Sequence, residues 1–253
     1  MSNPLPLPLS VLDELKTTPN LLSIVLMGSF ARGDDDEYSD IDLHVIVDGV
    51  RPADRFERLN GLRQLSVNFV QREHQNKVLT EPKAAMWGVL PARQARILHD
   101  PSGYYADLQQ RAQAFTWAQV VEKAGPIISH HLAGLTEETH KVLGGLGRGN
   151  FEKAMYAASD LAPSLAHVSA LANGALIPTE NRYFSTVRAA EPDAIWGELL
   201  WQALGLNDEP LKFRLEASAR LYARSAALYA AHLRPADAAL ALETAERVWA
   251  ALD

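Results

Sequence analysis

The chain contains no cysteine. This absence excludes disulfide bonds, zinc sites built on thiolates and cysteine nucleophiles, and nothing else in the composition indicates an oxidising compartment. The sequence also lacks an uninterrupted apolar run of about 18 residues, the length that indicates a membrane-spanning helix. Residues 1–10 contain prolines and no basic segment, so no signal peptide is predicted there. We therefore expect a cytoplasmic protein with no membrane partner.

The chain also has fewer basic than acidic residues. The chain has 24 Lys and Arg against 31 Asp and Glu, which gives a formal net charge of -7. Because DNA and RNA backbones require clustered positive side chains, this balance argues against a nucleic-acid partner. Hydrophobic residues make up 47% of the 253 positions, so the chain can fill a substantial core. A chain of this length is sufficient for two small domains.

The first 103 residues alternate short β-like runs with turns. Short apolar or alternating runs predict strands, and apolar residues at helical spacing predict helices. The predicted strands cover residues 21–27, 41–47, 65–70 and 96–98. The predicted helices cover residues 10–16 and 52–64, the second because Phe56, Leu59 and Leu62 would share one helix face.

From residue 104 onward the sequence is rich in Ala and Leu at helical spacing. Helices are expected near residues 104–123, 124–146, 150–173, 191–204, 209–232 and 235–251. The fold class is therefore predicted to be α+β. A small mixed-sheet domain over residues 1–103 is followed by an all-α helical bundle over residues 104–253.

One segment, residues 27–47, carries the chemistry. An apolar strand ends at Gly28-Ser29, and the next strand opens with Asp40 and Asp42. Because side chains alternate along a strand, both carboxylates point to one face, where they repel each other unless a cation joins them. Hard oxygen ligands of this kind suit Mg²⁺, which also bridges to phosphates. Gly28 allows a phosphate to approach the backbone, Ser29 offers it a hydroxyl and an N–H, and Arg32 offers a fixed positive charge.

Two neighbours of this segment have plainer explanations. The acidic residues 34–37 lack the spacing of an EF-hand loop, so we expect a solvated loop, whose carboxylates could equally well pair with Arg32. His44 lies on the face of Asp40 and Asp42, where we expect it to be packed, with contact to the site left open.

Together these residues resemble the signature of the DNA polymerase β-type nucleotidyltransferase superfamily, in which Gly-Ser is followed by Asp-x-Asp on the next strand. The form found here, residues 28–33 followed by residues 39–43, is most similar to the bacterial branch that includes the aminoglycoside and lincosamide nucleotidyltransferases and the minimal nucleotidyltransferase antitoxins. The antibiotic-modifying members also carry a helical C-terminal domain. The resemblance is strong over roughly 25 residues and looser over the first hundred.

The resemblance implies that Gly28, Ser29 and Arg32 bind the triphosphate of ATP or another nucleoside triphosphate. It also implies that Asp40 and Asp42 are catalytic and hold two Mg²⁺ ions. An acceptor hydroxyl would then attack the α-phosphorus and release pyrophosphate.

The sequence departs from this family at the third carboxylate, which relatives carry on a later strand. Asn68 stands where that acid is expected, and an amide cannot accept a proton at neutral pH. Glu73 is nearby, but its side chain would point to the opposite face of the sheet if the strand continues that far. The base is therefore unassigned. The other candidates are an acid from a second subunit of a homodimer, Glu81, Glu137 and Glu152.

Three functions remain open. The two-domain length favours an enzyme that transfers a nucleoside monophosphate to a hydroxyl of a small molecule, for example an aminoglycoside-like antibiotic. The first alternative is a protein-modifying, antitoxin-like nucleotidyltransferase, although such members are short. The second is a catalytically impaired nucleotide-binding protein, because of Asn68.

Overall fold

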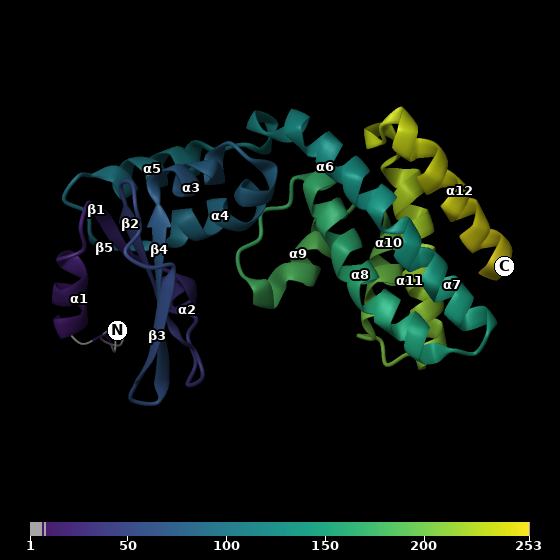
Figure 1. Ribbon diagram of the computed structural model, residues 1–253, viewed down its shortest axis with the longest axis horizontal. Coiled ribbons are helices and arrows are strands. Elements are labelled where there is room, and N and C mark those ends of the chain that lie inside the picture. The colour runs from purple at the N-terminus through teal and green to yellow at the C-terminus, as the bar shows by residue number, and fades with distance from the viewer. Residues whose placement is uncertain (1–6, 8, 253) are drawn as a thin grey trace. The chain divides into compact units, whose positions relative to one another are not determined.

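The computed structural model describes residue 7 and residues 9–252 (Figure 1). The chain divides into two compact units. Unit 1 runs to Gln119 and includes residues 178–180, and unit 2 comprises residues 120–177 and those from Asn181 onward. The signal-peptide prediction concerns residues 1–10, most of which lie outside the described residues.

Unit 1 combines a sheet with short helices, and α and η denote α-helices and 3₁₀ helices. In chain order its elements are α1 (Leu9–Lys16), β1 (Leu21–Leu26), α2 (Gly28–Arg32), β2 (Ile41–Val47), β3 (Arg55–Asn60), β4 (Arg63–Gln71), α3 (Arg72–Asn76), η1 (Lys77–Leu79), α4 (Pro82–Gln94), β5 (Arg96–His99), α5 (Tyr104–Ala114) and η2 (Trp117–Gln119).

The five strands form one mixed sheet in the order β3-β4-β2-β1-β5 (Figure 1). Strands β2 and β4 are parallel, whereas the other neighbouring pairs are antiparallel. Side chains alternate between its two faces, and each face packs on a core. On one face, Ile41 and Leu43 pack in the cluster that contains Val11 of α1. On the other, Ile46 packs in the cluster that contains Tyr105 of α5.

The helix predicted over residues 52–64 is wrong, because this segment forms β3 and the start of β4. The apolar spacing that suggested a helix does not mark a buried face, since Leu59 is 78% exposed and Leu62 is 100% exposed. Pairing with β4 decides the conformation instead. The two strands join through Gly61 and Leu62, and Gly61 has φ +64°, as a two-residue hairpin turn with glycine in its first central position requires.

The chain after residue 119 is helical apart from its connections. Its elements are α6 (Val121–Gly134), α7 (Thr136–Gly147), α8 (Phe151–Asn173), η3 (Glu180–Arg182), α9 (Tyr183–Ala190), α10 (Ala194–Leu204), α11 (Leu211–Leu228), η4 (Ala230–His232) and α12 (Pro235–Leu252). The predicted α+β class, a mixed sheet followed by many helices, is confirmed.

Unit 1 extends beyond residue 103, where the sequence predicts the domain boundary. The physical reason is packing: Tyr105 and Leu108 of α5 are fully buried in the cluster on one face of the sheet, so α5 joins the sheet domain. Among residues 9–252, no helix combines the length and the apolar character that crossing a bilayer requires.

Candidate active site

The turn between β1 and β2 brings Gly28 against a carboxylate. Gly28 has φ +68°, and a Cβ added there would lie 2.6 Å from Oδ2 of Asp42. The backbone N–H of Met27 donates to the carbonyl oxygen of Asp42 at 2.9 Å, which ties the turn to β2. Only glycine fits this position, because a side chain would be strained by the backbone angle and would displace the carboxylate. Ser29 follows directly and begins the short helix α2 with Gly28.

Asp40 and Asp42 stand at the entrance to β2. Asp42 is the second residue of the strand, and Asp40 precedes its first residue, with the buried Ile41 between them. Burial, followed by repulsion from Asp40, raises the pKa of Asp42 to about 6, although Arg55 and Arg32 act in the opposite direction. Asp40 is therefore close enough to destabilise the charge of Asp42, as the alternation of a strand predicts.

This pair of carboxylates fits a divalent cation that the substrate helps to hold. Among the described residues, no group of three or more His, Asp or Glu side chains is arranged to hold a metal ion by itself. Mg²⁺ is commonly bound by one or two carboxylates, waters and substrate phosphates, so two carboxylates beside a phosphate-accessible turn are sufficient. The hydroxyl of Ser66, which pairs with Asp42 across β2 and β4, is buried and has no hydrogen-bond partner among the described residues.

Arg32 lies at the end of α2, and its guanidinium binds Asp34. Its Nη2 is 3.0 Å from Oδ1 of Asp34, and its Nε donates to both carboxylate oxygens at 3.1 and 3.2 Å. This pairing is the plainer of the two roles that the sequence leaves open. Arg32 nevertheless lies near enough to lower the pKa of Asp42, so its charge acts on the site.

The third carboxylate that relatives carry is absent from β4. The parallel register places Ser66 beside Asp42 and Asn68 beside His44. Strand β4 continues to Gln71, and Glu73 lies beyond it, exposed on α3. Glu73 is therefore not brought onto the face of Asp42 by the strand.

An acid that the sequence analysis missed lies on the other side of β4. The antiparallel register places Glu57 of β3 opposite Ser66, so Glu57, Ser66 and Asp42 form one row across three strands. Directly opposed residues share a face of the sheet. Glu57 forms an ion pair with Arg55, the residue whose charge lowers the pKa of Asp42. The sequence held a signal for this hairpin in Gly61, since glycine is favoured at the first central position of a two-residue turn, but the helix predicted over residues 52–64 excluded a hairpin there.

His44 is packed on the same face as Asp42, as expected. Burial lowers its pKa to about 4, so the imidazole is neutral at physiological pH. It lines a cavity together with Met27 and Asn68, and all three belong to unit 1.

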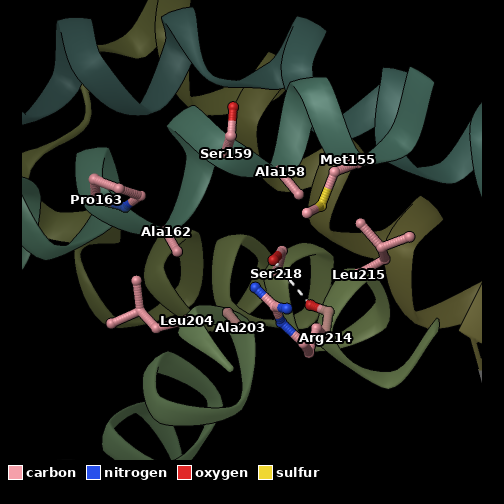
Figure 2. A pocket seen from close by; sticks show the side chains of 10 residues that line it. All are labelled: Met155, Ala158, Ser159, Ala162, Pro163, Ala203, Leu204, Arg214, Leu215 and Ser218. Carbon is pink, nitrogen blue, oxygen red and sulfur yellow. Dashed lines mark hydrogen bonds between the residues drawn. The ribbon is translucent and has the colours of Figure 1, made fainter. Parts of the chain in front are cut away.

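The helical unit contains a smaller cavity of about 160 Å³ between α8, α10 and α11 (Figure 2). Figure 2 shows its lining of mostly small and apolar side chains, with Arg214 as the charged group. No carboxylate lines this cavity. It therefore lacks the ligands that the chemistry of residues 28–42 requires.

Residues 10–83 match the family model described as the nucleotidyltransferase domain. Unit 1 contains a nucleotidyltransferase domain. The chain is also similar to a protein of Methanocaldococcus jannaschii that is named as a proposed protein adenylyltransferase. The two are 39% identical over 82 residues, which cover 29% of this chain and 55% of the relative, so the match spans about half the relative's length.

A solved structure shares the fold over most of the chain. It is the crystal structure of a nucleotidyltransferase-like protein from Exiguobacterium sibiricum, with a TM-score of 0.52 and 20% sequence identity. The match covers 87% of this chain and 76% of that one. At this identity the likeness concerns the fold, which therefore recurs with its helical part in a second protein.

Proposed function

We propose that this protein transfers a nucleoside monophosphate from a nucleoside triphosphate, with ATP as the first candidate, to an acceptor hydroxyl in a Mg²⁺-dependent reaction. The observation that carries the proposal is the contact between the Gly28 turn and the carboxylate of Asp42, beside Asp40. A triphosphate cradled by Gly28 and Ser29 would place its α-phosphate at the two carboxylates. The nucleotidyltransferase domain over residues 10–83 supports this assignment.

The reaction exchanges one phosphorus–oxygen bond for another. The acceptor oxygen forms a bond to the α-phosphorus, the bond to the bridging oxygen breaks, and pyrophosphate leaves with that oxygen. Mg²⁺ held by Asp40 and Asp42 would supply charge stabilisation to the attacking and leaving oxygens. Gly28 and Ser29 bind and orient the phosphates, and Arg32 adds positive charge once it exchanges Asp34 for a phosphate oxygen.

The proton released by the acceptor needs a base, and Asn68 cannot serve. Glu57 is the base that the sheet register supports, because only the small Ser66 separates it from Asp42 in their row. Its partner Arg55 could turn to a phosphate when substrate binds, which would release the carboxylate. An acid from the second subunit of a homodimer is the alternative candidate for the base. The homodimer is itself a prediction, and so is the cytoplasmic location.

For the acceptor, we propose a small hydroxylated molecule, for example an aminoglycoside-like one. The support is the long helical part after residue 119 and a net charge of -7, which favours a cationic acceptor.

A protein hydroxyl is the second candidate acceptor. The observation that favours it is the similarity to the Methanocaldococcus jannaschii protein, whose proposed activity is protein adenylylation. A screen of acceptors by pyrophosphate release separates the two, since a small-molecule enzyme responds to added compounds and a protein-modifying enzyme labels a polypeptide.

Calorimetry with each nucleoside triphosphate and Mg²⁺ tests the proposal. We expect Mg²⁺-dependent binding that the double variant Asp40→Ala/Asp42→Ala loses. The variant Asp35→Ala, which removes an exposed acid of the neighbouring loop, should bind as the native protein does. Absence of binding by the native protein would contradict the proposal, and binding without pyrophosphate release for any acceptor would indicate a catalytically impaired site.

A further inference from the structure

A cavity of about 610 Å³ lies within unit 1, lined by residues of β4, α3 and α4. Its volume is typical of small-molecule sites. On the sheet side, His44 and Asn68 are register neighbours on β2 and β4. On the helix side, α4 contributes Ala84, Trp87 and Pro91. Their spacing of three and four residues places them on one face of α4.

Two lining residues connect the cavity to the candidate active site. Met27 directly precedes Gly28, and its N–H donates to the carbonyl oxygen of Asp42. His44 is the next residue after Asp42 on the same face of β2. Same-face positions on a strand lie about 7 Å apart, so the cavity begins one side-chain repeat beyond the Asp42 carboxylate.

The side chains that line the cavity indicate which kind of ligand it could bind. Its one guanidinium, Arg51, and its one carboxylate, Asp54, pair with each other at 2.5 Å. This leaves no unpaired carboxylate for a polycationic acceptor and no unpaired Arg or Lys for a phosphate. The remaining lining combines the aromatic Trp87 with apolar side chains and with amide and imidazole groups, including Asn68 and His44. Such a surface suits an uncharged planar ring with polar edges.

We propose that this cavity holds the nucleobase and ribose of the nucleoside triphosphate whose phosphates lie at Gly28 and Asp42. The inference rests on the proposed function and extends it, because it assigns the base to unit 1 and the acceptor elsewhere. A nucleotide with its α-phosphate at Asp42 extends its sugar past His44, and its base then lies beside Trp87.

The test compares nucleoside triphosphates with inorganic tripolyphosphate, which has the phosphates but no base. Calorimetry of the native protein with Mg²⁺ should show tighter binding of at least one nucleoside triphosphate than of tripolyphosphate, by roughly tenfold or more, the range expected for stacking of one base. The variant Ala84→Leu narrows the cavity on the side of α4 and should reduce this preference while leaving the tripolyphosphate affinity unchanged. Lys83→Leu adds the same side chain at an exposed position next to it and should retain the preference.

A second pair of variants tests the same proposal independently, in case Ala84→Leu does not fold. Trp87→Ala should lower the nucleoside triphosphate affinity by roughly tenfold, whereas Trp87→Phe, which retains an aromatic face, should lower it much less. Neither should change the tripolyphosphate affinity. Circular dichroism and thermal melting identify the variants that fold.

The outcomes separate the two proposals. If the native protein binds tripolyphosphate and nucleoside triphosphates equally, or if folded Ala84→Leu and Trp87→Ala keep the native preference, the cavity does not hold the base. The proposed function then stands, because Mg²⁺-dependent binding of the phosphates at Gly28 and Asp42 is measured separately with tripolyphosphate. If the native protein binds neither probe with Mg²⁺, the proposed function fails and this inference fails with it.

Discussion

At the scale of single residues, Gly28 combines two constraints that can be separated experimentally. Gly28→Ala places a side chain at a φ of +68° and puts its Cβ 2.6 Å from Oδ2 of Asp42. Gly33→Ala also places a side chain at a positive φ, +78°, but its Cβ has no atom within 4 Å. We expect Gly33→Ala to lower the free energy of unfolding by about 1–2 kcal/mol from backbone strain alone. Gly28→Ala should cost more and should abolish Mg²⁺-dependent nucleotide binding. Calorimetry and denaturant titration measure both, and equal behaviour of the two variants would contradict the close contact.

Asp42 predicts a dependence of stability on pH in the absence of metal. Its pKa is raised from 3.8 to about 6, so the folded state binds more protons than the unfolded state between these values. The contribution of Asp42 to the free energy of unfolding therefore falls as pH rises through this range. Asp42→Asn removes this pH-dependent loss. We expect the substitution to stabilise the metal-free protein at about pH 8 by roughly 1–2 kcal/mol more than at about pH 4, less than the full pKa shift because solvent partly screens this carboxyl.

Urea unfolding in the presence of a chelator measures this effect. Asp35→Asn, at an exposed position, is the control and should show no such difference between the two pH values. An Asp42→Asn effect that is the same at both would mean that this carboxyl is not destabilised by burial and by Asp40.

At the scale of elements, the β3–β4 hairpin brings Glu57 into the row of Ser66 and Asp42, where we propose that it acts as the general base. Glu57→Gln should lower the rate of pyrophosphate release by about 10²–10⁴-fold, the usual contribution of a general base, and should flatten the acidic limb of its pH profile. Nucleotide affinity should change little. The matched control is Glu14→Gln, because Glu14 pairs with Arg58 of the same hairpin, 3.8 Å away. Arg58 lies opposite Leu65, a residue of the core on the other face. An unaltered rate in Glu57→Gln would return the role to a second subunit.

The junction of α7 and α8 depends on a glycine for a different reason. A Cβ at Gly145 would lie 2.7 Å from Cβ of Ala154 and 2.8 Å from the carbonyl oxygen of Asn150, whereas one at Gly147 would meet nothing within 4 Å. Gly145→Ala should therefore lower the free energy of unfolding by about 1–3 kcal/mol through overpacking. Gly147→Ala should be neutral or slightly stabilising, because alanine favours a helix. Thermal melts of both variants check this, and equal melting temperatures would contradict the close packing.

At the scale of the whole molecule, the division into two units predicts that the nucleotide site is complete in one of them. The sheet, its two cores and residues 28–42 all belong to unit 1. We expect a fragment of residues 1–119 to fold and to bind Mg²⁺ and nucleoside triphosphate within about tenfold of the full-length affinity, roughly 1.4 kcal/mol. Calorimetry measures the ratio. A folded fragment that does not bind would mean that residues beyond 119 contribute to the nucleotide site.

The sequence alone determined the fold class and predicted a site at Gly28, Asp40 and Asp42. These features depend on neighbours a few residues apart: apolar runs, a glycine at the end of a strand, and alternation that puts two carboxylates on one face. The same locality explains why α8, α10, α11 and α12 were predicted with approximately correct bounds. The single helix predicted over residues 124–146 is wrong, because this segment forms α6 and α7, and α9 was not predicted.

Only the tertiary structure decided which strand lies beside which. Phe56, Leu59 and Leu62 have helical spacing but form no buried helix face, and residues 55–60 are a strand because β4 pairs with them. That pairing places Glu57 in the row of Ser66 and Asp42, and the packing of α4 near β4 creates the cavity beside His44. The hairpin itself is local, but the β2–β4 pairing that completes this row and the packing that forms the cavity join residues distant in sequence, which no local pattern encodes.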